Sequence, residues 1–515
     1  MLLRRCPRLC QRYYRHPRSR RPVLHQRPPR RQRHLRLHWR RHRRHPRLHR
    51  HPRYRRRQLR QLRRLRWHRH RGFGLREMGK PDTVDPDTVF QLASFSKPIA
   101  STIVAAVVSD GTVAWDSRIS DIDTTFQLHD AYPTAQVTIR DLFAHRSGLF
   151  GEGGNDLEGL GFDRDEIVHR LRYLRPASSF RAGYAYSNFG VTEGALATAK
   201  ATGRSWEDIA DEKLYRPLGM RSTSSRYTDF LMRANRASLH VRLNGIWTAL
   251  VKRNPDAQSP AGGVSSNARD LAEWMHLELG NGKYAGKPLI KQAAIEETHL
   301  PTIMRGRNPI TGDPAFYGLG WNVDYGEHGV VWGHAGAFSQ GARTVVNLIP
   351  SEQLGIVVVA NAFPIGVPEG IADTFFDLVF AGKPSREWVK AWNEIYDSHF
   401  GPATIKAAIA PYATPPASPT PAMPLSAYAG TYANDYVGDI RVVVANGALE
   451  LQVGPAGRTY PLKHFDRDLF VYAPFPETPD WVVSVTFAMG AAQRATQVTI
   501  ENLNDDGQGV LLRVE

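Results

Sequence analysis

The 515-residue sequence predicts an α+β protein that ends in a separate all-β module. Apolar residues recur at helical spacing after residue 98, and the chain to about residue 300 is mainly helical in pattern. After residue 330 the hydrophobic period changes from about 3.6 to 2, which is typical of strands. A Pro- and Ala-rich segment, 402–424, then precedes Asn446-Gly447, a strong hairpin signal. We therefore expect an antiparallel sheet flanked by helices, then a linker and a small β domain.

The first 70 residues differ in composition from the rest of the chain. They contain 28 of the 68 Lys and Arg residues, all of them Arg, and none of the 49 Asp and Glu residues. Residues 71–515 therefore carry a net charge of about −9, which disfavours binding along nucleic-acid phosphates. The segment has no hydrophobic period, so we expect it to be disordered. Both cysteines, Cys6 and Cys10, lie in it, and cysteine usage indicates no redox compartment.

The arginine-rich segment also resembles the product of a shifted reading frame or a misplaced start. Arg, His, Pro, Leu and Gln make up 60 of its 70 residues, and all five have codons that begin with C. Lys, which has no such codon, is absent there, although a functional polycation would be free to use it. We therefore expect residues 1–70 not to be a natural part of this protein. Translation of the upstream DNA in the other two frames tests this expectation.

Local signals place the helices and strands of the main domain. A helix should begin close to Ser94, because Pro98 is tolerated only in a first turn, and end at Gly111. Thr138 and Asp141 match a capping box. Further helices are expected at 163–174, 205–214 and 268–279. Strands are expected at 330–333, 343–349 and 354–361, with helices at 375–380 and 386–396 covering one face of their sheet.

Composition divides the chain into four segments: an arm at 1–70, the main domain at 71–400, a semi-rigid linker at 401–424 and the β module at 425–515. Strands of the module are expected at 439–445, 448–453, 481–487 and 496–500. No run of about 18 apolar residues occurs, so no integral membrane segment is expected. No apolar stretch follows the N-terminal arginines, so no secretory signal is readable and the localisation stays unknown.

Ser94 and Lys97 are the first candidate catalytic residues. Residues i and i+3 lie on one face of a helix, so the Ser94 hydroxyl and the Lys97 amine can form a hydrogen bond. A serine beside an amine is an activated-nucleophile arrangement. Backbone N–H groups at the start of the helix can also stabilise an oxyanion. The pair alone is weak evidence, because the pattern S-x-x-K recurs by chance.

Two later motifs add further candidate site residues to Ser94 and Lys97. Tyr186-Ser-Asn188 places two polar side chains on one side of an extended loop, and Gly333-His-Ala-Gly336 lies at the end of the first predicted strand. The order S-x-x-K, Y-x-N, then a triad ending in Gly resembles the serine β-lactamase and penicillin-binding superfamily. Within it, the chain is most similar to the class C-like esterases and D-amino-acid peptidases. The phrases LFAHRSGL, RPLGM, PAGGVSSNARDLAEWM and YGLGW add to the resemblance, which covers about 71–395.

The resemblance implies a β-lactamase/transpeptidase-like fold and a role for each motif residue. Ser94 would be the nucleophile, Lys97 its hydrogen-bonded base and Tyr186 the proton carrier to the leaving group. Which of Lys97 and Tyr186 takes the serine proton stays open. Among substrate-binding groups, Asn188 would hold the carbonyl side of the substrate, and Gly336 would let it lie against the strand. Ala337, after the triad, would complete the oxyanion hole with its N–H.

Further implications concern ligands and partners. His334 stands where β-lactamases usually have Lys, and a largely neutral imidazole attracts a substrate carboxylate less than an ammonium does. We therefore expect a small ester or peptide-like substrate rather than a β-lactam. No metal and no cofactor are expected, since no His, Asp and Glu cluster has metal-ligand spacing. The resemblance suggests an extracytoplasmic or periplasmic location, and the oligomeric state stays open.

The resemblance also bears on the N-terminal arm. Related proteins place a helix and two strands ahead of the position of Gly72 to Gly74, and no such pattern occurs here. We therefore expect unpaired backbone groups and exposed apolar surface beside Val330–Gly333, and poor solubility of the 515-residue chain.

Two other function classes are considered. A catalytically silent member of the fold could bind a peptide or a partner protein, but intact Ser94, Lys97 and Tyr186 argue against it. A nucleic-acid-binding protein built on the arginine arm is disfavoured by the acidic body and by the lack of aromatic residues in a basic setting.

Overall fold

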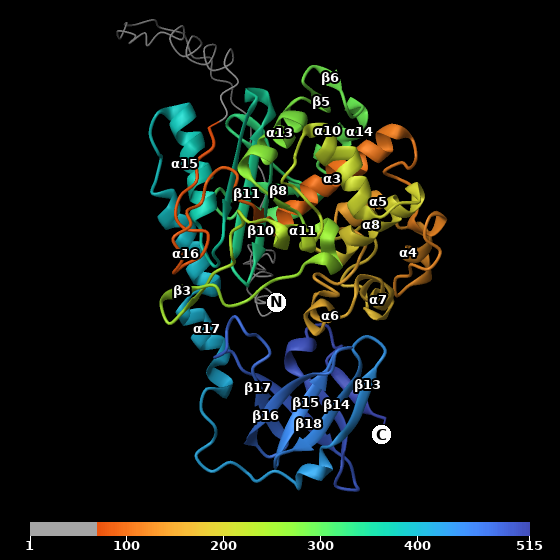
Figure 1. Ribbon diagram of the computed structural model, residues 1–515. Helices are drawn as coiled ribbons and strands as arrows, with labels where there is room; N and C mark the ends of the chain where they lie inside the picture. Colours follow the sequence, from red (N-terminus) through yellow and green to blue (C-terminus); the bar gives the residue numbers. More distant parts are fainter. Residues whose placement is uncertain (1–68, 515) are drawn as a thin grey trace, which may run out of the picture. The chain divides into compact units, whose positions relative to one another are not determined.

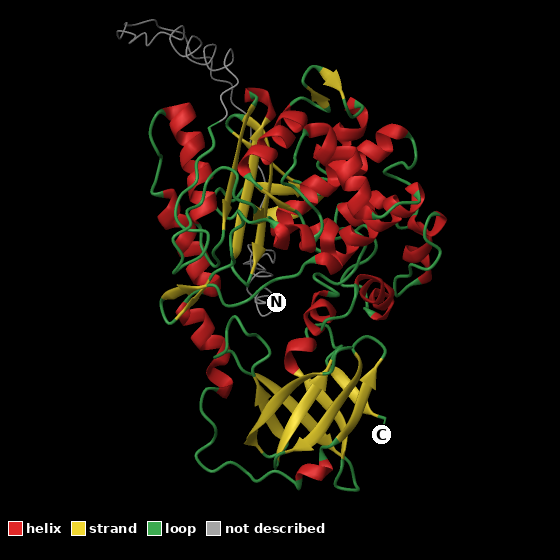
Figure 2. Cartoon of the chain, in the orientation of Figure 1, coloured by secondary structure: helices red, strands yellow, loops and turns green. Residues whose placement is uncertain are grey.

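The computed structural model describes residues 69–514. Predictions for the arm at 1–70, including its disorder and the positions of Cys6 and Cys10, fall outside these residues except at positions 69 and 70. The described chain confirms the α+β class and the all-β C-terminal module (Figures 1 and 2).

A six-stranded antiparallel sheet is the centre of the main domain, with the strand order β12-β11-β10-β9-β8-β7. The Val- and Ile-rich runs become its three longest strands, as predicted. Three further strands were missed because their sequences contain Pro, Gly, Asn and Asp, which have low strand propensity, and sheet pairing holds them instead. The strands are β7 Ile303–Arg307, β8 Pro314–Tyr317, β9 Asn322–Gly326, β10 Gly329–Phe338, β11 Ala342–Ile349 and β12 Leu354–Ala360.

Two predictions about β10 were wrong. The triad His334 to Gly336 lies inside the strand, because the register with β11 continues to Phe338 opposite Ala342. Val330–Gly333 is not at an unpaired side of the sheet either, since all four residues pair with β9, and Trp332 and Gly333 also pair with β11. Within the described chain, β12 is the outer strand at this end of the sheet.

Helices lie on both faces of the sheet (Figure 2). On one face α15, Val367–Ala381, packs against β11 and β12, and α16, Trp388–Phe400, packs against α15. The other face contacts the short turn Ala93–Phe95 and α13, Ala268–Leu279. The sheet is therefore packed directly against the segment that contains Ser94.

The helix α3 of the helical region spans Ser96–Asp110 and ends at Gly111, which has a φ of 84° as the predicted cap requires. Its apolar stripe, including Ile99 and Ile103, is fully buried. The capping box at Thr138 and Asp141 is confirmed. The remaining helices are α4 Ala131–Gln136, α5 Ile139–Phe143, α6 Asn155–Leu160, α7 Arg164–Arg170, α8 Asn188–Thr202, α9 Trp206–Ala210, α10 Arg216–Leu218, α11 Tyr227–Met232, α12 Ser259–Gly262 and α14 Gln292–Glu296.

Short strand pairs connect these helices. They are β1 Phe90–Gln91 with β4 Ser265–Ser266, β2 Val241–Leu243 with β3 Ile246–Thr248, and β5 Lys283–Tyr284 with β6 Lys287–Pro288. The segment expected to be a linker contains the helix α17, Pro402–Ile409, and a turn at Ala410–Tyr412.

The C-terminal module is a closed eight-stranded barrel. The predicted hairpin is confirmed, because Asn446 and Gly447 both have positive φ and Ala445 pairs with Ala448. Four of the strands were not predicted individually. The strands are β13 Gly430–Asn434, β14 Gly438–Ala445, β15 Ala448–Val453, β16 Arg458–Asp466, β17 Leu469–Tyr472, β18 Val483–Met489, β19 Ala495–Ile500 and β20 Val510–Arg513.

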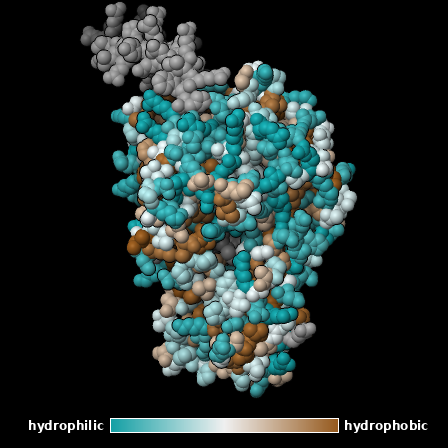
Figure 3. Space-filling view, viewed as in Figure 1, coloured by the Kyte–Doolittle hydropathy of each residue, from teal (hydrophilic) through white to brown (hydrophobic). Residues whose placement is uncertain are grey.

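The face in Figure 3 is mainly hydrophilic, and its hydrophobic residues gather in separate patches. Among residues 69–514, no helix combines the length and the apolar character needed to span a membrane.

Candidate active site

Ser94 lies in the 3-10 turn Ala93–Phe95, which leads directly into α3. The residue before it, Ala93, has a φ of 50° although it carries a Cβ, and its side chain is fully buried. This left-handed conformation costs on the order of 1 kcal/mol and persists only where the surroundings enforce it. Ala93 packs in a small buried cluster with Leu239, Phe338 and Ala342. The strained turn, which no sequence signal revealed, sets the direction of the Ser94 side chain.

Lys97 is fully buried beside Ser94. Its Nζ lies 3.1 Å from Ser94 Oγ, 2.6 Å from Asn188 Oδ1 and 3.0 Å from the Ala261 carbonyl oxygen. Burial lowers the pKa of Lys97 well below its usual range, and the charge of Glu152 opposes this only in part. A neutral amine has two hydrogens and one lone pair. Since Asn188 Oδ1 and the Ala261 carbonyl can only accept, a neutral Lys97 would direct its lone pair at Ser94 Oγ.

Tyr186 lies against Lys97, whose Nζ is 4.5 Å from the centre of the phenol ring. Burial raises the pKa of Tyr186 above its usual range, and a hydrogen bond with Ser94 opposes the rise. The phenol therefore keeps its proton at neutral pH. The Tyr186 ring also packs against the His145 ring at a centroid distance of 4.6 Å.

Asn188 begins α8, where the Ser187 side chain caps the helix by accepting from Gly190 N–H. Its Oδ1 accepts from Lys97, and its Nδ2 donates to Asn155 Oδ1 at 3.2 Å. In the structure, this side chain thus holds Lys97 and is itself held by α6. Its predicted contact with a substrate stays a prediction.

His334 is buried next to this group, and both of its ring nitrogens contact protein atoms. Its Nδ1 lies 2.7 Å from the Ala335 carbonyl, which can only accept, so Nδ1 carries the hydrogen. Its Nε2 then accepts from the Tyr317 hydroxyl at 2.9 Å. Burial lowers the pKa of His334 to about 3. The imidazole is therefore neutral, and its one N–H is used within the protein.

Gly336 allows β10 to lie against the Ser94 turn. A Cβ at this position would meet the Leu92 carbonyl oxygen at 2.2 Å and the Phe95 nitrogen at 2.8 Å. Thr344 on β11 donates to the same Leu92 oxygen at 2.7 Å. Ala337, the next residue in β10, lies opposite Arg343. All seven residues singled out in the sequence are thus in or next to one site, which combines two helix starts and one strand.

Three residues of this site were missed in the sequence, Asn155, Ala261 and Tyr317, and a fourth, His145, was expected to be a helix-end or core hydrogen-bonding residue. His145 is buried, has a φ of 56°, and accepts from Ser187 N–H through Nδ1. Burial lowers the pKa of His145 well below its usual range. His145 and Tyr317 belong to two phrases noted above, LFAHRSGL and YGLGW, which were the available signals. Ala261 belongs to a third phrase, PAGGVSSNARDLAEWM, whereas Asn155 had no signal, because only a tertiary contact brings it to Asn188.

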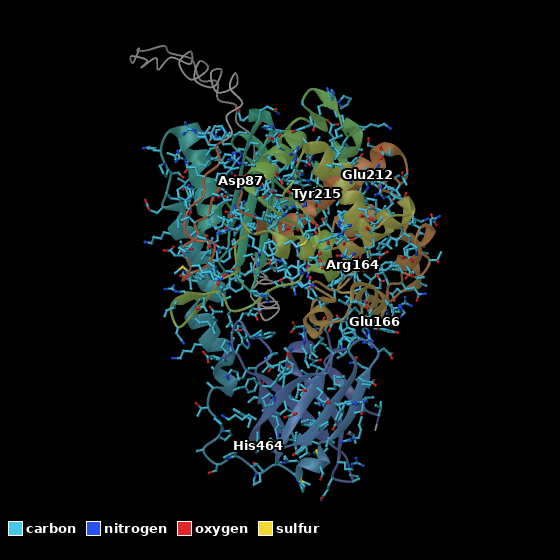
Figure 4. The ribbon with its side chains drawn as sticks, viewed as in Figure 1. Asp87, Arg164, Glu166, Glu212, Tyr215 and His464 are labelled. Atoms are coloured by element: carbon cyan, nitrogen blue, oxygen red, sulfur yellow. The ribbon has the colours of Figure 1, made fainter. Side chains whose placement is uncertain are left out.

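A cavity of about 540 Å³ lies elsewhere, among α9, α10 and α11. Tyr215, labelled in Figure 4, lines this cavity together with several Arg, Asp and Glu side chains. None of the candidate active-site residues lines the cavity. No group of three His, Cys, Asp or Glu residues within 69–514 is arranged to hold a metal ion.

Comparison with known proteins gives matches along most of the chain. Residues 62–375 match the beta-lactamase family, and residues 414–512 match a domain of unknown function, DUF3471, which corresponds to the barrel. Unguisins hydrolase ungD' of Aspergillus campestris is 29% identical over 389 residues, which are 70% of this chain and 70% of that protein.

Two further relatives cover large parts of the chain. The D-alanyl-D-alanine-carboxypeptidase/endopeptidase AmpH of Escherichia coli is 26% identical over 324 residues, or 60% of this chain and 80% of that protein. The octameric penicillin-binding protein homologue from Pyrococcus abyssi is 18% identical and has a TM-score of 0.51, covering 84% of this chain and 90% of that one. This last likeness concerns the fold, and it confirms the expected β-lactamase/transpeptidase-like architecture.

Proposed function

The chain belongs to the beta-lactamase family, and from this premise we propose that it is a serine hydrolase that forms an acyl-enzyme on Ser94. The observation that carries the proposal is the environment of Lys97. Its amine is buried and lies within hydrogen-bonding distance of Ser94 Oγ. Its other two partners, Asn188 Oδ1 and the Ala261 carbonyl oxygen, can only accept hydrogen bonds. An amine held in this way accepts a proton from Ser94 as the hydroxyl attacks a carbonyl carbon.

The pKa values support an assignment of the base. Burial lowers the pKa of Lys97, which favours the neutral amine as the proton acceptor, and raises that of Tyr186, which favours the phenol as the proton donor. In the acylation step, the Ser94 proton passes to Lys97 as the C–O bond forms. Tyr186 then protonates the leaving amine or alcohol and recovers a proton from Lys97, so the protons balance.

Hydrolysis of the acyl-enzyme needs the same groups in reverse. A water molecule gives a proton to the base as it attacks the ester carbonyl, and Ser94 recovers its proton as it leaves. The N–H groups of Ser94 and Ala337 would stabilise the oxyanion in both steps, as the family resemblance implies. The close approach of Gly336 to the Ser94 turn supports this pairing.

For substrates, we propose short-chain esters or D-amino-acid amides rather than β-lactams. His334 is neutral, and its one ring N–H already donates to Ala335. A substrate carboxylate would therefore find no cation at the position of the usual Lys. The name of the Escherichia coli relative, a D-alanyl-D-alanine-carboxypeptidase/endopeptidase, points to peptide-type substrates.

The test is intact-mass spectrometry after incubation with a fluorophosphonate. We expect one covalent adduct on the wild-type protein and none on Ser94→Ala. Ser101→Ala is the matched control, because Ser101 is a buried serine of α3, the helix that follows the Ser94 turn, with no hydrogen-bond partner for its hydroxyl. A folded wild-type protein that stays unlabelled would instead support a catalytically silent, peptide- or partner-binding member of the fold.

A further inference from the structure

The barrel contacts the main domain at two places next to the candidate active site, one on the α6 side and one at the end of β10. Both contacts use buried polar side chains of the barrel. Tyr436, between β13 and β14, is 1% exposed, and Glu477, between β17 and β18, is 3% exposed.

On the α6 side, Tyr436 bonds to both residues that flank Asn155. Its hydroxyl accepts from Gly154 N–H at 2.9 Å and donates to Asp156 Oδ1 at 2.6 Å. Asp156 is itself 1% exposed, so this is a buried, charge-assisted bond. The barrel thereby fixes the start of α6 at the residue that holds Asn188.

Further bonds attach the same region to the barrel. Arg170 of α7 donates to the Tyr436 carbonyl at 2.8 Å and is paired with Glu166, which Figure 4 labels. Arg458 of β16 donates to the Gly159 carbonyl at 2.7 Å. A Cβ on Gly454 would meet the Leu160 carbonyl oxygen at 2.1 Å, so barrel and α6 backbones are in direct contact.

From α6 the contacts continue to the base in two steps. Asn155 Oδ1 accepts from Asn188 Nδ2, and Asn188 Oδ1 accepts from Lys97 Nζ. Because an amide has one oxygen and one NH₂ group, holding the NH₂ at Asn155 turns the oxygen toward Lys97. The position of Asn155 therefore determines whether the Lys97 lone pair is directed at Ser94.

At the end of β10, Glu477 bonds to the turn that joins β10 to β11. Its Oε1 accepts from Ser339 Oγ at 2.8 Å and from Gln340 Nε2 at 2.6 Å. This turn directly follows Phe338, which packs in the buried cluster with Ala93. The second contact therefore supports the strained residue that precedes Ser94, and it lies two residues beyond Ala337.

We propose that the barrel positions both halves of the active site, through Tyr436 on the Lys97 side and Glu477 on the Ser94 side. The two side chains are positioning residues, since neither lies within the group of reacting atoms. The proposal rests on the proposed function for its kinetic consequences, and its structural part is independent of catalysis. It assigns a role in hydrolysis to the region that matches a domain of unknown function.

The first test compares Tyr436→Phe with Tyr472→Phe in the full-length protein. Tyr472 is a buried barrel tyrosine whose hydroxyl donates to Asn502 at 2.8 Å, so its variant loses a similar bond inside the barrel. For p-nitrophenyl butyrate we expect Tyr436→Phe to lower kcat by on the order of 10-fold to 100-fold with KM nearly unchanged. Tyr472→Phe should lower the unfolding temperature and leave kcat unchanged. Equal kcat in the two variants would overturn the proposal.

The second test uses the acceptor chemistry of Glu477. Glu477→Gln keeps an oxygen that accepts from Ser339, whereas Glu477→Ala does not. We expect a fluorophosphonate to label the Ala variant at least about 10-fold more slowly than the wild type. The Gln variant should be labelled at close to the wild-type rate. Equal labelling of both variants and the wild type would contradict a positioning role.

Hydrogen exchange measured by mass spectrometry tests the positioning role of Tyr436 even if the protein is not a hydrolase. Tyr436→Phe should speed exchange in peptides covering 150–160 and 187–190, and Tyr472→Phe should not. If exchange there is unchanged, the positioning proposal is wrong whatever the activity. If wild-type Ser94 is not labelled but exchange responds as expected, the proposed function alone is wrong.

Discussion

Substitution of Gly336 tests how closely the sheet must approach the nucleophile. An alanine Cβ at this position would lie 2.2 Å from the Leu92 carbonyl oxygen, 2.5 Å from Thr344 Oγ1 and 2.8 Å from the Phe95 nitrogen. Ordinary contacts begin near 3.4 Å, so β10 and the Ser94 turn must separate by about 1 Å. Two of the three contacts are backbone atoms, which cannot rotate away.

The expected cost has two parts. Overpacking of this kind destabilises the native state by about 1–3 kcal/mol. A displacement of about 1 Å between a nucleophile and its oxyanion site lowers the rate by on the order of 100-fold. We therefore expect Gly336→Ala to fold with a lower unfolding temperature and to lose about 100-fold in kcat/KM for a p-nitrophenyl ester.

Gly326→Ala is the matched control. Gly326 ends β9 of the same sheet, and a Cβ there would meet no atom within 4 Å. This variant should keep both the wild-type unfolding temperature and wild-type kinetics. If Gly336→Ala behaves in the same way as Gly326→Ala, the close approach of β10 to the Ser94 turn is not what the site requires, and the reasoning is refuted.

Two further predictions concern pH and substrate choice. Protonation of Lys97 removes the acceptor for the Ser94 proton, so kcat/KM should fall as the pH is lowered. Because burial lowers the pKa of Lys97, this fall should occur at a pH below the ordinary range of lysine. A profile that rises up to about pH 10, the ordinary range of lysine, would contradict this assignment. Short-chain p-nitrophenyl esters or D-amino-acid amides should be turned over faster than nitrocefin, because neutral His334 offers no cation to a carboxylate. Steady-state assays decide this, and a nitrocefin kcat/KM of about 10⁶ M⁻¹s⁻¹ or more would overturn the preference.

Features set by neighbouring residues could be predicted from the sequence alone. Ser94 and Lys97 are one helical turn apart, the Thr138 box closes within four residues, and Asn446-Gly447 requires only two positive φ angles. Each of these depends on steric and hydrogen-bonding preferences that act over a few residues. The order of the three motifs along the chain was enough to suggest the family.

Tertiary structure alone decided the properties of the site that depend on distant residues. The Ala261 carbonyl, 164 positions from Lys97, accepts a hydrogen bond from the Lys97 amine. Asn155, 33 positions from Asn188, accepts from the Asn188 amide and orients it. The hydroxyl that bonds to His334 Nε2 comes from Tyr317, and the strained φ of Ala93 depends on packing against Phe338. The weak strands β7 to β9 and the contacts of Tyr436 and Glu477 belong to the same class. Burial and long-range pairing create these features, and neither is encoded in the residues next to them.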